Sequence, residues 1–149
     1  MPGNIYGVAF PAVHAVQQAG TTTSLVAGTE TVFITNANIG AVTQGNWYVM
    51  AFCTAIILMG ATAPTALKFA LTLNGGSDNQ TYTVNPNTLV ASTYQTYSFV
   101  ICSNSSATVF WPSVVTVAIT GLASTTAATS QAAGTQAQFL LCRSADSYV

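Results

Sequence analysis

The run of apolar residues from Trp47 to Met59 constrains the fold of this chain more than any other feature. It holds thirteen nearly unbroken apolar positions between a polar turn at residues 43–46 and Gly60. A transmembrane helix needs about 20 apolar residues, and a strand with one face in water alternates apolar and polar side chains. The run therefore predicts a long strand buried on both faces, through the core of a β-sandwich or through a subunit interface.

The rest of the chain predicts shorter strands separated by turns, and no helix. The segments expected to be strands are Thr21–Ala27, Glu30–Thr35, Asn46–Met59, Thr65–Leu73, Gln80–Val84, Thr93–Cys102, Thr108–Trp111, Ser113–Thr120 and Gln136–Cys142. Asn36–Gln44 and the low-complexity stretch Gly121–Gly134 are expected to be loops. Turns every 8 to 15 residues or so, with connections of unequal length, are typical of an antiparallel β-sandwich of the jelly-roll type. The fold class predicted is therefore all-β, a single jelly roll of about eight strands.

The first twenty residues differ from the remainder of the chain. Residues 1–20 are apolar but not periodic, because prolines and glycines interrupt them. We expect an extended N-terminal arm over residues 1–20 and one sandwich domain over residues 21–149. The arm either docks on a neighbouring molecule or packs along its own sandwich, and the sequence favours neither alternative.

Charge is nearly absent from this chain. Only 3% of the residues are charged and the formal net charge is −1, whereas an ordinary soluble domain carries about 25% charged residues. Little charge repulsion keeps copies apart, so we expect the free chain to associate. Neutral polar side chains are also cheaper to desolvate than charges, which suits contact with other proteins. A surface adapted to extreme pH is a compatible alternative. The only cations apart from the histidine, Lys68 and Arg143, cannot form a nucleic-acid-binding patch.

The mean hydropathy of +0.49 raises the question of a membrane span. Gly60 and Pro64 interrupt the one candidate segment, Trp47–Ala70, and the chain begins without a cationic region. We therefore expect no membrane span and no export signal.

The residues able to carry chemistry are few and dispersed. The chain has one histidine, His14, and its three carboxylates, Glu30, Asp78 and Asp146, lie in separate segments. No nucleophile–base set or metal-ligand spacing results, so we expect no enzyme, no metal and no cofactor. The three cysteines, Cys53, Cys102 and Cys142, form no Cys-x-x-Cys pair. We expect them to be buried free thiols of a protein made in a reducing cytoplasm.

Apolar side chains of the arm and of the strands are the candidate interface. The residues chosen are Phe10, Val13, Trp47, Tyr48, Phe110 and Trp111. The chain's aromatic residues, Tyr94 and Tyr97 among them, also offer a sugar-stacking platform, although aromatic side chains in strands are more often core or interface.

Three segments give the chain a likeness to known proteins: Val26-Ala-Gly-Thr-Glu-Thr-Val-Phe, Trp47-Tyr-Val-Met-Ala-Phe and Ala118-Ile-Thr-Gly. In architecture the chain resembles, over about Thr21 to Cys142, the small jelly-roll (TNF-like) structural proteins of bacteriophages and related viruses. These are capsid decoration (cementing) proteins and fibre heads. Many phage surface proteins are acidic, so the near absence of charge is a departure from them.

The resemblance implies a non-enzymatic virion protein. Such proteins commonly form homotrimers and sit on the shell of the major capsid protein, so we expect a trimeric decoration protein, made in the host cytoplasm, that stabilises the capsid surface. The alternatives are a small single-jelly-roll capsid protein, a phage fibre head, or a carbohydrate-binding or adhesin module.

Overall fold

The computed structural model describes residues 11–42, 45–73, 76–103, 107–109 and 113–143, and it describes side chains for most of them. The elements are β1 (Pro11–Gln18), β2 (Thr23–Leu25), β3 (Thr31–Val42), β4 (Gly45–Met59), β5 (Leu67–Leu73), β6 (Gly76–Thr83), the 3-10 helix η1 (Pro86–Thr88), β7 (Tyr94–Cys102), β8 (Ala107–Val109), β9 (Ser113–Ala123), β10 (Ala128–Ser130) and β11 (Gln136–Arg143). The all-β class is confirmed.

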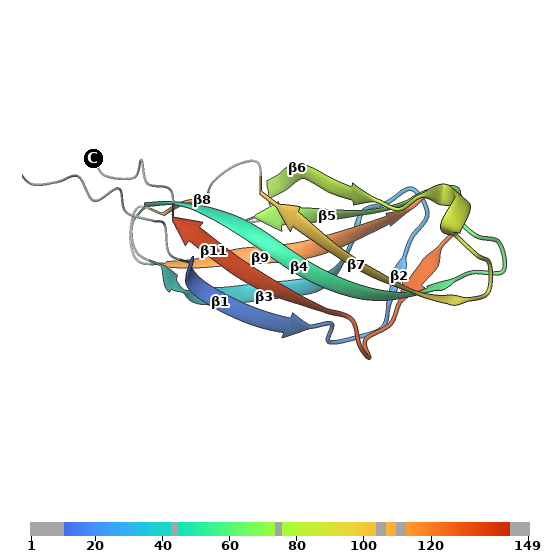
Figure 1. Cartoon of the computed structure of the whole chain (residues 1–149), viewed down its shortest axis with the longest axis horizontal. Coiled ribbons are helices and arrows are strands. Elements are labelled where there is room, and N and C mark those ends of the chain that lie inside the picture. The colour runs from blue at the N-terminus through green and yellow to red at the C-terminus, as the bar shows by residue number, and fades with distance from the viewer. Residues whose placement is uncertain (1–10, 43–44, 74–75, 104–106, 110–112, 144–149) are drawn as a thin grey trace, which may run out of the picture.

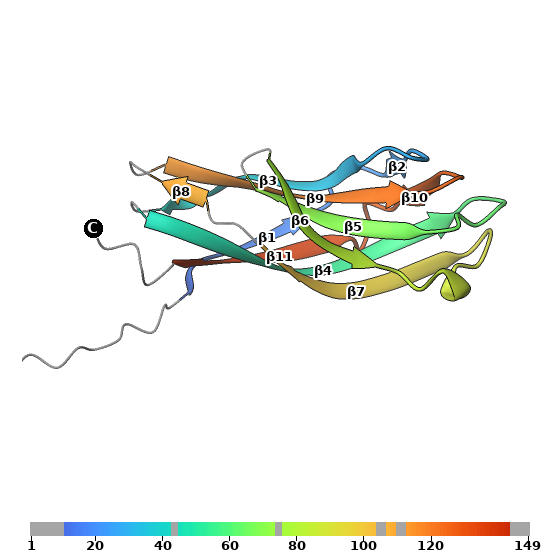
Figure 2. The same ribbon diagram turned by 90° about the horizontal axis from the view of Figure 1, so that it is seen from above.

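Two antiparallel sheets lie face to face (Figure 1; Figure 2). The first sheet contains β1, β11, β4 and β7 in that order, with the short strands β2, β8 and β10 at its ends. The second sheet has the order β3-β9-β5-β6. Among the long strands, each connection passes to the other sheet, except the β5–β6 hairpin. This connectivity is that of a jelly roll.

Strand β4 is the longest element and a central strand of the first sheet. One of its edges pairs with β11 and then β10, and the other edge pairs with β8 and then β7. Its odd-numbered side chains from Trp47 to Met59 are buried, whereas Tyr48 and Phe52 are 40% and 44% exposed. The alternative in which the sandwich core buries both faces of this run is therefore corrected, and burial of the second face in a subunit interface stays a prediction. Successive side chains of a strand point to opposite sides, and the second sheet covers only one of them.

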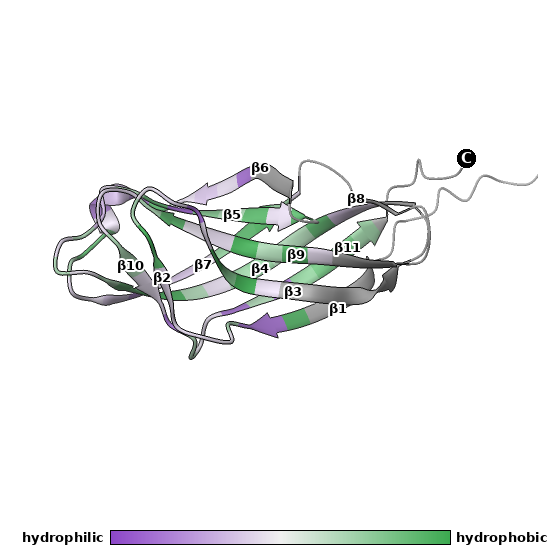
Figure 3. Ribbon diagram, turned by 180° about the vertical axis from the view of Figure 1, so that it is seen from behind, coloured by the Kyte–Doolittle hydropathy of each residue, from purple (hydrophilic) through white to green (hydrophobic). Residues whose placement is uncertain are grey.

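The core lies between the sheets and is centred on Phe69 of β5. Its ring stacks on Phe99 of β7 with 4.7 Å between the ring centroids, and Tyr82 stacks on Phe99 at 4.8 Å. Phe33 approaches Phe69 edge-on at 5.8 Å. These rings join the two sheets, so burial of aromatic area contributes strongly to their association. Hydrophobic residues are prominent in the central strands β4, β5, β9 and β11 (Figure 3).

Two predictions about local structure were wrong. Residues 36–42 belong to β3 rather than to a loop, because β3 follows β9 as far as the pair Val42↔Ser113. The register of this pairing shifts between Asn36 and Ile39 and again between Ile39 and Val42, as β-bulges allow. The low-complexity stretch likewise contains β10, which pairs with β2 and β4. Pro11–Gln18 of the expected arm forms β1 and pairs with β11, so this part follows the second alternative and packs along its own sandwich, which satisfies the backbone groups of that edge.

Candidate functional site

The outer face of the first sheet, which points away from the core, is the unusual surface of this molecule. Residues directly opposite each other in an antiparallel pair share a face, so the register defines rows across β1, β11, β4 and β7. One row is Val16, Gln138, Phe52 and Val100. The row beside it contains Leu140, Met50 and Cys102, and the next contains Cys142 and Tyr48. These three rows form an apolar zone on the surface of the molecule.

The two sheets differ in what they show to solvent. In the described part of the chain, the large apolar side chains that are at least 40% exposed on the outer face of the first sheet are Val16, Tyr48, Phe52, Tyr94 and Val100. Among its side chains that the structure describes, the second sheet has one such residue, Val32. Its outer face instead exposes Lys68, Thr81 and Thr83. An unpaired apolar face of this kind marks an interaction site.

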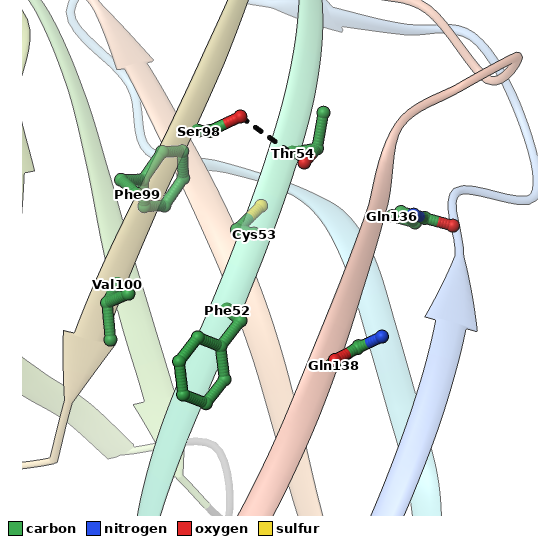
Figure 4. Close-up of a pocket in the computed structure, with 8 residues that line it drawn as sticks. All are labelled: Phe52, Cys53, Thr54, Ser98, Phe99, Val100, Gln136 and Gln138. Carbon is green, nitrogen blue, oxygen red and sulfur yellow. Dashed lines mark hydrogen bonds between the residues drawn. The ribbon is translucent and has the colours of Figure 1, made fainter.

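A polar row crosses the same outer face. Gln18, Gln136, Thr54 and Ser98 lie directly opposite one another on β1, β11, β4 and β7. The hydroxyl oxygens of Thr54 and Ser98 are 3.5 Å apart, and the dashed line in Figure 4 marks this contact. Beside this row the surface is hollowed by about 380 Å³. The residues that line the hollow are Phe52, Cys53, Thr54, Ser98, Phe99, Val100, Gln136 and Gln138.

The three cysteines occupy different environments, which corrects the prediction of three buried thiols. Cys53 points into the core and is 3% exposed, and its burial raises the pKa of the thiol to about 12. Cys102 is exposed and Cys142 is half-buried, both on the outer face of the first sheet. The difference arises because β7 and β11 place these two residues on the side that the second sheet does not cover.

Titratable and metal-binding side chains are few in the part of the chain that the structure describes. There, no three His, Cys, Asp or Glu side chains come close enough together to hold a metal ion. The side chains of His14, Asp78 and Asp146 lie outside that part. Among the described residues, no helix is long and apolar enough to cross a membrane.

The candidate interface residues chosen from the sequence are dispersed by the fold. Tyr48 lies on the outer face, but Trp47 is 2% exposed and belongs to the core, so it offers no surface to a partner. Val13 lies in β1 opposite Leu141, and its side chain is not described. Phe10, Phe110 and Trp111 lie outside the described residues.

Sequence reasoning missed Phe52, Met50 and Leu140. The signal was present, because an apolar run longer than a dozen residues places apolar side chains at even as well as odd positions. What was absent was the identity of the neighbouring strands, since β11 and β7 come from distant parts of the chain.

No protein-family model matches this chain, and no curated protein matches it. Solved structures that resemble it include the Eiger TNF of S. frugiperda, at 10% identity and a TM-score of 0.43, covering 92% of this chain and 95% of that chain. The CBM36-1 domain of a multidomain xylanase from the hindgut metagenome of Trinervitermes trinervoides has 6% identity and a TM-score of 0.33, covering 85% and 95%.

A third similar structure is that of the infectious bursal disease virus Gx strain, at 12% identity and a TM-score of 0.31. The match covers 90% of this chain and 38% of the viral chain. Likenesses this weak carry no argument about function. The strand order and register of the chain itself show what it is in architecture: a single antiparallel jelly-roll sandwich.

Proposed function

We propose that this chain is a non-enzymatic viral structural protein that forms a homotrimer and decorates the outside of a capsid. There it reinforces the joints between subunits of the major capsid protein. The observation that carries the proposal is the outer face of the first sheet, where Tyr48, Phe52 and Val100 are exposed on a chain with almost no charge. Three is the number of copies implied by the resemblance to phage jelly-roll proteins.

The charge of this face favours a second copy of the same chain as its partner. The described side chains in its rows are all uncharged residue types, from Val16 on β1 to Val100 on β7. Identical charges that met near a symmetry axis would repel each other, whereas a neutral face is compatible with itself.

The size of the face is also adequate for assembly. From Tyr48 to Leu58 it extends about 34 Å, and four strands span about 19 Å, which gives about 650 Å². A stable interface buries roughly 800 Å² on each partner. The face therefore approaches the ordinary size of one interface, and a trimer centred on it would leave the outer face of the second sheet for contact with the shell.

Two related roles use the same assembly. A phage fibre head would present the trimer at the end of a fibre, and a small single-jelly-roll capsid protein would build the shell itself. The two cations of the chain, Lys68 and Arg143, count against a shell that faces a packaged genome. The protein is therefore proposed to be a decoration protein that is made in the host cytoplasm and resides on the virion surface.

Solution mass is the first test. Native mass spectrometry and sedimentation are measured on the purified chain across a hundredfold dilution. We expect a trimer that dissociates only at the lowest concentrations. A chain that stays monomeric at every concentration would rule out the trimer.

Contact with the shell needs a separate test. Capsids that lack this protein are mixed with it and sedimented, and we expect the chain to travel with the particles. Removal of residues 1–10 then tests the arm, because β1 begins at Pro11 and a longer deletion would expose the edge of β11. Loss of capsid binding with the trimer intact would support docking of residues 1–10 on the capsid.

One observation favours a second candidate, the binding of a neutral saccharide. The 44% exposed ring of Phe52 lies beside the amides of Gln136 and Gln138 at the hollow. Aromatic rings stack on sugars, and amides bind their hydroxyl groups. Calorimetric titration with neutral oligosaccharides separates the two candidates. Saccharide binding by a monomer, lost in Phe52→Ala, would favour the second candidate, whereas a trimer without saccharide binding supports the first.

A further inference from the structure

The polar row Gln18, Gln136, Thr54 and Ser98 does not fit a purely apolar interface. It crosses four strands in register, and Gln138 lies in the adjacent row opposite Phe52. Tyr48, Met50 and Phe52 lie on one side of it along β4, and Ile56 and Leu58 lie on the other. The row is thus a band of hydrogen-bonding groups inside an apolar surface.

The amide groups of this band are unpaired in the single chain. Within the described part of the molecule, the side chains of Gln136 and Gln138 have no hydrogen-bond partner, and both are exposed to water. The only hydrogen bond between side chains of the polar row is the long contact of Thr54 with Ser98, at 3.5 Å. If the face is covered, each amide needs a new partner, because a buried polar group without one is costly.

A second copy supplies such partners only in alignments that bring the two amide-bearing rows together. A glutamine amide has both donor and acceptor atoms, so it pairs with another glutamine amide. A copy displaced further, so that the rows of Leu140 and Cys142 faced the amides, would leave the amides unpaired. The hollow beside Thr54 and Ser98, whose side chains are short, leaves room for a side chain from the other copy.

We propose that the polar row, together with Gln138, pairs with the polar residues of neighbouring copies and fixes the register and number of subunits. This inference rests on the proposed self-association and adds the residues that give it specificity. The apolar rows supply affinity, and the amides exclude the alternative alignments. Single polar residues in apolar coiled-coil interfaces act in the same way, at a cost in stability.

The decisive experiment removes the amides and keeps the volume. The double variant Gln136→Leu/Gln138→Leu is compared with the unchanged chain by native mass spectrometry over a range of concentrations. We expect association at least as tight as before, but with the single oligomer replaced by a mixture of sizes. The matched control is Thr81→Leu/Thr83→Leu on the outer face of the second sheet, which should leave the oligomer distribution unchanged.

A variant with a charge at Gln138 tests whether this residue lies in the interface between copies. Gln138→Glu introduces identical charges on every copy, so we expect a dissociation constant raised at least tenfold. Circular dichroism and the melting midpoint of each variant, measured at a concentration where it is monomeric, check that the fold is intact.

The outcomes separate the two proposals. If the unchanged chain is a monomer, the proposed assembly fails, and this inference fails with it. If the unchanged chain is a trimer and the double leucine variant is still one discrete trimer, the assembly stands and the specifying role of the polar row is overturned.

Discussion

The two faces of strand β4 are almost equally apolar, yet only one has a partner within the chain. On the inner face, Ala51 and Ile57 are fully buried by the second sheet, whereas Phe52 on the outer face is 44% exposed. The residues of the two faces alternate along one segment, so composition and propensity do not distinguish them. The length of an apolar run therefore indicates how much apolar surface has to be buried. It does not indicate whether that surface is buried by the same chain or by a partner.

Substitutions on the two faces of β4 should differ most in their effect on the free energy of unfolding. Ile57→Ala removes a fully buried side chain, so we expect it to lower the free energy of unfolding by about 2–5 kcal/mol. Phe52→Ala on the outer face should cost the single chain less than about 1 kcal/mol. Denaturant unfolding at concentrations where the chain is monomeric measures both. Equal losses would mean that the single chain also covers the outer face.

A charge on the outer face should abolish association while the fold persists. Phe52→Asp places a carboxylate on the apolar surface of every copy, and we expect a dissociation constant raised at least a hundredfold, or about 2.7 kcal/mol. Thr81→Asp on the outer face of the second sheet is the control, and should leave the dissociation constant unchanged. Sedimentation across dilution gives both values. A trimer of normal affinity in the Phe52 variant would locate the interface elsewhere.

Burial of Cys53 should make the stability of the chain sensitive to alkaline pH. The folded pKa of Cys53, about 12, lies above its ordinary value of 9.0, so its contribution to stability is full below pH 9. That contribution falls by about 1.4 kcal/mol per pH unit as the pH rises from 9 toward 12. Denaturant unfolding at pH 8 and pH 10 measures the change, and Cys53→Ala should reduce it.

Thiol labelling at pH 8 gives a second measurement on the cysteines. Exposed Cys102 should react with an aromatic disulfide reagent in the folded chain, and Cys53 only after unfolding. If copies associate through the outer face, labelling of Cys102 should slow as the protein concentration rises. A rate independent of concentration, in a chain shown to be a trimer, would argue against this face.

The smallest expected effect concerns a polar group on the covered side. The hydroxyl of Ser130 is fully buried and has no hydrogen-bond partner in the described part of the chain, unlike the exposed amides of the polar row. Ser130→Ala should therefore raise the free energy of unfolding by about 1 kcal/mol, because an unsatisfied buried group is removed. Thermal unfolding measures the change. A loss of stability would show that the hydroxyl has a partner.

The sequence predicted the fold class and most of the strands, because their patterns are local. Thr93–Cys102 alternates along its length, and the structure places Tyr97, Phe99 and Ile101 in the core. It did not predict that β3 continues to Val42 or that β10 forms in a low-complexity stretch. Those strands exist through pairing with β9, β2 and β4, and such partners cannot be read from local propensity.

The candidate site was also predicted from the sequence only in part. The near absence of charge and the length of the apolar run are properties of the sequence, and they already indicated association between proteins. The sequence alone did not place Phe52, Val100 and Gln138 side by side, or separate Trp47 from Tyr48. Tertiary structure decided these points, because the register of β11 and β7 on β4 sets which residues share a row, and the second sheet covers one face only.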